Sequence, residues 1–236
     1  MAKSDVKLLG AWTSPFVMRA RIALNIKSVD YEYQEENWLV SKSELLLKSN
    51  PIHKKVPVLI HADNPICESL IIVQYIDEVW SSGPSILPSD PYDRATSRFW
   101  SAYIDDKWFP PMIAFLFAQE EDAKKAAIAQ MEEGLVPLEE TFGKFSKGKA
   151  FFGGDRIGFL DIAFGCFLGW LRVIEKVGGI ELLNETKTPS LLKWAERFSS
   201  DTAVKELIPD TDKLAEFGKA LPEFGKALQA KMRANN

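Results

Sequence analysis

The stretch KVPVLIHADNPICESLIIVQYIDEVW, residues 55–80, determines how the first third of the chain folds. The apolar run at 57–61 predicts a short buried strand, and the dipeptide at 64–65 predicts the turn after it. A second short strand is expected at 66–67. From Ser69 onward the apolar residues recur every three or four positions, which predicts a helix with one buried face. That face consists of Ile72, Ile76, Val79 and Trp80.

The residues before this stretch add two strands and two helices. Residues 6–11 predict a buried strand that ends at Ser14-Pro15, where a helix begins. The face of this helix consists of Phe16, Ala20, Ala23 and Leu24. Residues 31–34 predict a second strand, and residues 42–49 predict a polar helix. The resulting order, β-α-β-α-β-β-α, is typical of a small mixed sheet covered by helices.

The second half of the chain carries no convincing strand pattern. Residues 81–91 are rich in Pro, Gly, Ser and Asp, which is typical of a linker. Helical periodicity follows at 92–120, 122–145, 159–177, 190–198 and 212–233. We therefore expect an α/β domain at 1–81, a linker at 82–91 and an all-helical domain at 92–236.

Composition excludes several classes of function. The net charge of −4 and the pI of about 5.4 argue against a nucleic-acid partner, which requires a clustered basic surface. The two cysteines lie in no redox or zinc spacing, and two histidines are too few to suggest a zinc site. The first residues lack the apolar core of a signal peptide, and no apolar run is long enough to span a bilayer. We expect a cytosolic protein with no metal and no membrane partner.

Five segments resemble the tau class of plant glutathione transferases. They are WTSPF at 12–16, NPIHKKVPVLI at 50–60, ICESLIIVQYIDEVW at 66–80, FFGGD at 151–155 and GFLDIA at 158–163. The resemblance extends from about residue 6 to the last helix. It implies an α/β thioredoxin-like N-terminal domain followed by an all-α C-terminal domain, the cytosolic glutathione transferase fold. It also implies a homodimer, with glutathione as co-substrate and no cofactor.

Ser14 is the predicted catalytic residue. It lies where a strand meets a helix, and the N–H groups at a helix start favour an anion. A free thiol with a pKa of about 8.5 is only about 3% thiolate at neutral pH, and a pKa lower by ~2 units requires ~2.7 kcal/mol. One hydrogen bond to a charged group supplies ~1.5–3 kcal/mol. The residues alone also allow Ser14 to be a simple helix cap, whereas the resemblance implies that it holds the thiolate.

The resemblance also assigns the groups that hold glutathione. Glu68 faces the ammonium and Ser69 the carboxylate of the γ-glutamyl end, while Lys42 and Lys55 meet the glycyl carboxylate. Val56 offers its backbone to the cysteinyl part, and the bond that follows Val56 is cis. The residues alone also allow Ser69 to be an N-cap and the two lysines to be solvated surface charges.

The second substrate is expected to occupy an apolar cleft beside Ser14. The expected lining residues are Trp12, Phe16, Phe109, Met112, Ile113, Leu116, Trp170, Phe217 and Leu221. Each ring could instead be ordinary core. Pro110-Pro111 predicts a kink that widens this cleft.

One departure from the family concerns the helix that begins near residue 158. Gly158 stands where the family often has Ser or Thr, so Asp161 can form only half of a capping box. We expect this to affect the stability of the helix more than the chemistry.

These observations predict an enzyme that adds glutathione to hydrophobic electrophiles in detoxification, with glutathione peroxidase activity on organic hydroperoxides as an additional possibility. The alternative is a non-catalytic carrier (ligandin) of hydrophobic small molecules. The intact glutathione-site residues favour the enzyme, because a pure carrier does not need them. A thiol-transfer enzyme would require a cysteine at position 14, where this chain has Ser14.

Overall fold

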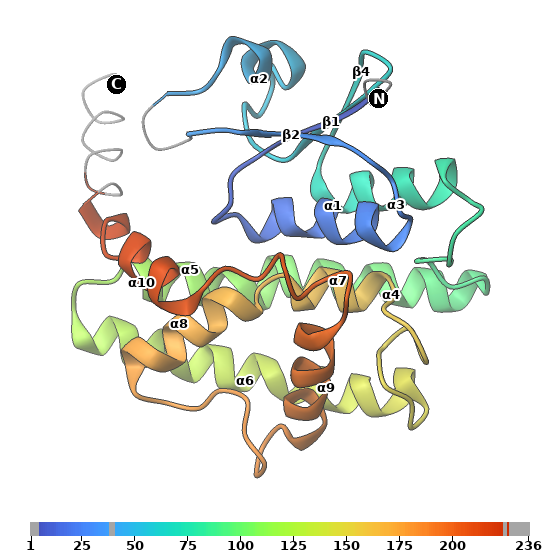
Figure 1. Ribbon diagram of the computed structural model, residues 1–236. Helices are drawn as coiled ribbons and strands as arrows, with labels where there is room; N and C mark the ends of the chain where they lie inside the picture. The colour runs from blue at the N-terminus through green and yellow to red at the C-terminus, as the bar shows by residue number, and fades with distance from the viewer. Residues whose placement is uncertain (1–4, 38–40, 224–225, 227–236) are drawn as a thin grey trace.

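The computed structural model describes residues 5–37, 41–223 and 226. These residues form a small sheet with its helices, stacked on a larger all-helical unit (Figure 1). The thioredoxin-like and all-α fold class is confirmed. No helix in the described ranges is long and apolar enough to cross a bilayer.

The N-terminal unit has the predicted order of elements. They are β1 (Val6–Gly10), α1 (Pro15–Ile26), β2 (Glu32–Glu35), α2 (Glu44–Ser49), β3 (Val58–His61), β4 (Asn64–Cys67) and α3 (Ser69–Val79). The sheet order is β2-β1-β3-β4, in which β1 is parallel to β2 and antiparallel to β3. Helices α1 and α3 lie between the sheet and the helical unit, and α2 lies on the other face (Figure 1).

The turn between β3 and β4 lies two residues earlier than predicted. It is formed by Ala62 and Asp63, which both have positive φ, as a tight hairpin turn requires. Asn64 begins β4, and its amide donates to the carbonyl of Ala62 at 3.0 Å. Pro65 is tolerated within β4 because β4 is an edge strand. The predicted turn at 64–65 was therefore wrong.

The predicted helix at 92–120 is interrupted by a wider turn. It consists of α4 (Pro91–Tyr103), the π-helix η1 (Ile104–Trp108) and α5 (Phe109–Phe117). Pro110 and Pro111 have no N–H to donate to the carbonyls four residues earlier, and these carbonyls belong to η1. A π-turn is one way to absorb that loss, so the interruption predicted at the two prolines is a π-turn.

The remaining helices are α6 (Glu121–Ser146), α7 (Phe159–Gly165), α8 (Leu168–Gly178), α9 (Pro189–Ser200) and α10 (Thr211–Gly218). The single helix predicted at 159–177 is wrong, because a turn at Cys166 and Phe167 separates α7 from α8. The helix predicted at 212–233 is interrupted: α10 ends at Gly218, a turn follows at 219–220, and residues 221–223 are helical again. Apart from Lys226, the part of that prediction beyond residue 223 lies outside the described residues.

A buried ion pair holds the linker against the N-terminal unit. Lys27, the residue after α1, contacts Asp77 of α3 at 2.6 Å, and both side chains are buried. The Asp77 carboxylate also accepts hydrogen bonds from the N–H groups of Ile86 and Leu87, each at 2.9 Å. One hydrophobic core then continues from the sheet through α1 into the helical unit. The two units are thus joined by the core as well as by the chain.

Candidate active site

The strand register brings the predicted glutathione contacts to one end of the sheet. Leu9 of β1 pairs with Val58 of β3, which pairs with Cys67 of β4. Consequently β1 ends, β3 begins and β4 ends at the same end of the sheet. Three predicted contact residues adjoin these strand ends: Ser14 after β1, Val56 before β3 and Glu68 after β4. The bond after Val56 is cis, as the resemblance implied.

Ser14 is the N-cap of α1. Its Oγ accepts a hydrogen bond from the Val17 N–H at 3.3 Å, so the capping role is present. That bond uses only a lone pair of the hydroxyl, and the hydroxyl proton remains free to be donated. Pro15 occupies the next position and has no N–H. The capping and thiolate-holding roles of Ser14 are therefore compatible.

Glu68 and Ser69 lie at the start of α3, where the backbone is strained. Glu68 has φ of +69°, a value that non-glycine residues rarely adopt, and its side chain is 61% exposed. The Ser69 side chain is instead buried, and its Oγ accepts from Arg19 at 3.2 Å. Strain of this kind is concentrated at functional sites. The exposed Glu68 carboxylate is available to a ligand ammonium.

Arg19 lies directly behind Ser69 and was not predicted from the sequence. It is fully buried in α1 and binds Asp105 of η1 through two hydrogen bonds of 2.5 and 2.9 Å. It also donates to the carbonyl of Ala163 at 2.7 Å. Its guanidinium places a buried positive charge beside Ser69 and connects the site to the helical unit. The sequence signal was a charge on a face otherwise apolar, since Arg19 follows Phe16 by three positions.

The two predicted lysines have exposed side chains on either side of α2. Neither Lys42 nor Lys55 forms an ion pair within the described residues, so both are available to a carboxylate. Buried Glu36 accepts from the Ser43 hydroxyl at 2.6 Å and thereby fixes the segment next to Lys42. The Asn50 amide donates to the carbonyl of Lys55 at 3.0 Å. The backbone near both lysines is therefore held by buried polar side chains.

Neither cysteine can replace a bound thiolate. Burial raises the pKa of the Cys166 thiol to about 12. Burial, together with the neighbouring Glu68 charge, raises the pKa of Cys67. Both cysteines therefore stay protonated at neutral pH. In the described part of the chain, no group of three or more His, Cys, Asp or Glu side chains could hold a metal ion.

The predicted electrophile residues fall into two aromatic groups. In the first, the Phe16 ring lies 5.2 Å from Phe109 and 5.8 Å from Phe167, centroid to centroid. In the second, Phe217 of α10 lies 5.8 Å from Trp12 and 6.4 Å from Trp170. Both groups adjoin the loop that carries Ser14. Phe167 was not among the predicted residues because it lies in the unpredicted break between α7 and α8.

The other predicted electrophile residues differ in exposure. Met112 has no exposed surface, so it lies in the core and offers nothing for an electrophile to contact. Met112 alone of this predicted face is fully buried, which its helical spacing from Phe109 could not reveal. Leu221 is also buried, at 4% exposure, whereas Leu116 is half-buried and Ile113 is exposed. The apolar wall is therefore narrower than predicted.

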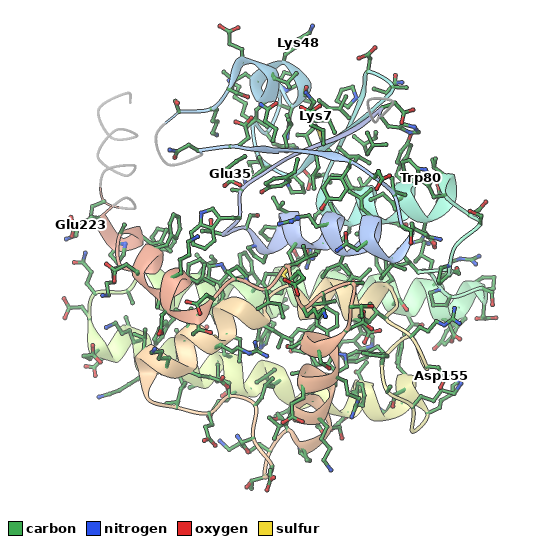
Figure 2. The ribbon with its side chains drawn as sticks, in the orientation of Figure 1. Lys7, Glu35, Lys48, Trp80, Asp155 and Glu223 are labelled. Atoms are coloured by element: carbon green, nitrogen blue, oxygen red, sulfur yellow. The ribbon has the colours of Figure 1, made fainter. Side chains whose placement is uncertain are left out.

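Helix α10 covers the loop that precedes Ser14. The Nζ of Lys213 lies 4.7 Å from the centroid of the Trp12 ring, a cation–π contact. The indole N–H of Trp170 donates to the carbonyl of Thr13 at 2.8 Å. The Trp12 N–H donates at 3.0 Å to Glu35, which lies at the same side of the molecule as α10 (Figures 1 and 2). These contacts hold the loop from both units.

Comparisons with known proteins agree with this geometry. The family model described as the glutathione S-transferase N-terminal domain matches residues 4–78, and that of the C-terminal domain matches residues 121–197. Glutathione S-transferase U17 of Arabidopsis thaliana is 65% identical over 94% of this chain and 97% of its own. The crystal structure of a tau-class glutathione S-transferase from mango, Mangifera indica, superposes with a TM-score of 0.89 at 69% identity, covering 93% of this chain and 100% of that one. The chain belongs to the tau class of glutathione transferases.

A second solved structure is more distant in sequence. A rice glutathione transferase solved in complex with glutathione superposes with a TM-score of 0.85 at 37% identity. The superposition covers 94% of this chain and 98% of the rice protein. Members of the family therefore share this fold across a wide range of identity.

Proposed function

We propose that this glutathione S-transferase holds the thiolate of glutathione at Ser14 and transfers it to hydrophobic electrophiles. The observation that carries the proposal is that Ser14, Val56 and Glu68 converge at one end of the sheet. The Ser14 hydroxyl proton is still available to the sulfur. A rice relative was solved with glutathione, which supports the same ligand here. The proposal requires no cofactor beyond this co-substrate.

Each charged group of glutathione meets protein groups that complement its charge. Glu68 faces the ammonium, and Ser69, backed by the buried Arg19 charge, receives the γ-glutamyl carboxylate. Lys42 and Lys55 meet the glycyl carboxylate, and Val56 pairs through its backbone with the cysteinyl part. These contacts fix the tripeptide at points away from its sulfur. The sulfur is then presented to the start of α1.

Catalysis consists of thiolate stabilisation and proximity. The sulfur attacks the electrophilic carbon, and the leaving group departs with the bonding electrons. With an organic hydroperoxide, the sulfur would take the terminal oxygen and release an alcohol. A second glutathione would then form the disulfide and water. The aromatic groups around Trp12 and Phe16 favour apolar acceptors.

A steady-state assay tests the substrate class. The protein is supplied with glutathione and a panel of aryl halides, isothiocyanates and organic hydroperoxides. We expect saturable turnover that requires Ser14 with at least one class of apolar electrophile. Tight binding of an apolar dye, without turnover of any panel member, would contradict the proposal and favour a carrier. The relatives, which are named as transferases, support catalysis rather than the carrier.

We also propose that the protein is a cytosolic homodimer. Helices α3 and α4 are joined by hydrogen bonds of 2.6 and 2.9 Å from Arg98 to Gln74. Beside this contact, Ile71, Phe99 and Tyr92 are between 54% and 77% exposed. An apolar face of this kind favours association. Both cysteines are free, which suits a reducing compartment.

A further inference from the structure

A cavity of about 450 Å³ lies away from the proposed glutathione site. Its walls come from the linker, the start of α4, the end of α6 and the loop at 149–158. Asp155, in that loop, and α10 lie at opposite sides of the helical unit (Figures 1 and 2). None of the residues that we assign to glutathione or to the electrophile lines this cavity. A ligand here would not compete for the active site.

The floor of the cavity is apolar. It is formed by side chains from three different segments, which are each at most 6% exposed: Ile86, Phe152, Ile157 and Leu160. A volume of this size falls within the range of small-molecule sites in proteins, which are lined mainly by apolar groups. The floor therefore suits a hydrocarbon or aromatic body.

Two buried serines add polar groups without partners. Ser97 of α4 is 3% exposed and Ser146 of α6 is 2% exposed, and both line the cavity. Neither hydroxyl forms a hydrogen bond with the residues that the structure describes. The nearby Ser101 and Thr141 hydroxyls, in contrast, both donate to backbone carbonyls of their own helices. Because buried hydroxyls normally find a partner, these two are available to a ligand.

The rim of the cavity is basic, because four cationic side chains line it against one carboxylate, Asp93. Its cationic side chains are Lys144, Lys147, Lys149 and Arg156. Lys149 pairs with Asp155 at 2.6 Å, and Lys144 lies 3.9 Å from Glu140. Lys147 and Arg156 form no ion pair within the described part of the chain. A local excess of positive charge on a chain of net charge −4 attracts an anion.

We propose that this cavity binds a carboxylate with an apolar body, such as a fatty acid anion. The hydrocarbon would contact the floor, and the carboxylate would meet Lys147 and Arg156 at the rim. The Ser97 and Ser146 hydroxyls would donate hydrogen bonds to the same carboxylate. A ligand bound in this cavity would take no part in the transfer of glutathione.

Calorimetry of the full-length protein tests this proposal. Dodecanoate is titrated into the protein with S-hexylglutathione saturating the active site, below the concentration at which dodecanoate forms micelles. We expect one dodecanoate per chain. The variant Lys147→Glu/Arg156→Glu should bind dodecanoate at least tenfold more weakly. The matched control is Lys193→Glu, an exposed lysine of α9 outside the cavity, which should bind like wild type.

Two further measurements distinguish a specific site from nonspecific hydrophobic binding. Dodecanol, which has the same tail without the charge, should bind at least tenfold more weakly than dodecanoate. Ser97→Leu, which fills the cavity, should lose dodecanoate binding while keeping its conjugation rate. Displacement of dodecanoate by S-hexylglutathione would overturn the proposal. Unchanged affinity in the charge-reversed variant, or no binding to wild type, would also overturn it.

Discussion

The hydroxyl group of Ser14 can serve two purposes at the proposed site. Its oxygen accepts the Val17 N–H, which stabilises the start of α1, and its proton remains for a ligand. The capping role and the proposed thiolate-holding role are therefore compatible with one orientation of the same side chain. For this reason the sequence alone could not separate the two roles, because both place the residue at a helix start.

Other residue-scale features depended on tertiary contacts. Arg19 lies on an apolar helix face, and its importance comes from Asp105, which is 86 positions away. Met112 was predicted to line the electrophile cleft, but it is fully buried. Helical spacing grouped Met112 with Ile113 and Leu116, but it could not show which of the three is buried. Motif residues next to strand ends were predictable because the sheet register brings them together.

Ser14→Cys tests the position of residue 14. A cysteine at this helix start should become a thiolate, attack a glutathione mixed disulfide and release the other thiol. A second glutathione would then release oxidised glutathione and restore the cysteine. We expect loss of most conjugation, gain of mixed-disulfide reduction and one added tripeptide per chain by intact mass. Full conjugation without an adduct would show that residue 14 does not face the sulfur.

Glu68→Ala should affect binding more than chemistry. The variant removes a ground-state contact to the ammonium and leaves the sulfur untouched. We expect the KM for glutathione to rise roughly five- to tenfold, with little change in kcat. The control is Glu78→Ala, another carboxylate of the same helix far from its start. Equal glutathione affinity for Glu68→Ala and wild type, measured by calorimetry, would refute the assignment.

At the scale of elements, Asp161 supplies the half of the capping box that a glycine at position 158 permits, by accepting the Gly158 N–H. Its carboxylate accepts N–H groups from Phe152 and Gly153 in the preceding loop, from Gly158 and from the Trp194 indole, at 2.7–2.9 Å. One buried acid thus holds α7, its loop and α9 together. The half capping box expected from the sequence is present, and the three other bonds attach the preceding loop and α9 to the start of α7.

Asp161 also predicts an unusual pH dependence. Burial raises the pKa of this carboxyl from 3.8 to about 6, although its four hydrogen bonds oppose the rise. Between pH 6 and 4 the folded chain therefore holds a proton that the unfolded chain lacks. The group thus adds stability as pH falls through this window, by up to ~3 kcal/mol, since each pKa unit is ~1.36 kcal/mol.

Asp161→Asn removes this titration. The amide should destabilise the fold at pH 8 by roughly 1–3 kcal/mol, because its nitrogen faces N–H donors. The difference in unfolding free energy between wild type and Asp161→Asn should grow as pH falls from 8 to 5, because only wild type gains stability by protonation of Asp161. Urea unfolding of both proteins at each pH measures this difference. The other titratable groups are the same in both proteins, so their contributions cancel. A difference that stays constant with pH would refute the raised pKa.

The boundaries of elements show where sequence patterns stop being sufficient. The apolar periodicity continues through residues 159–177, yet the helix breaks after Gly165. A Cβ at Gly165 would lie 2.3 Å from the Phe198 ring of α9, so this position is set by a distant helix. The Ala62-Asp63 turn was missed because neither residue is typical of positive φ in the way glycine is. The sequence of strands and helices before residue 80 was predictable because periods of two and of 3.6 alternate clearly.

At the scale of the molecule, the continuous core joins the two units, and the Lys27–Asp77 pair holds the linker against the N-terminal unit. The apolar face on α3 and α4 remains open. Phe99→Glu should convert a dimer to a monomer, because it places a charge on that face. Val177→Glu is the matched control, since Val177 is similarly exposed on α8. Sedimentation velocity at micromolar concentration separates the two states. A dimeric Phe99→Glu variant would show that the partner binds elsewhere.

The thiolate itself gives the most direct test of the whole account. The ultraviolet absorbance of glutathione bound to wild type and to Ser14→Ala is titrated with pH at saturating glutathione. We predict a thiol pKa ~2 units below that of free glutathione in wild type, and a pKa roughly 1–2 units higher in the variant, as expected for one charge-assisted hydrogen bond. The same thiol pKa in both proteins would contradict the account and leave Ser14 as a helix cap alone.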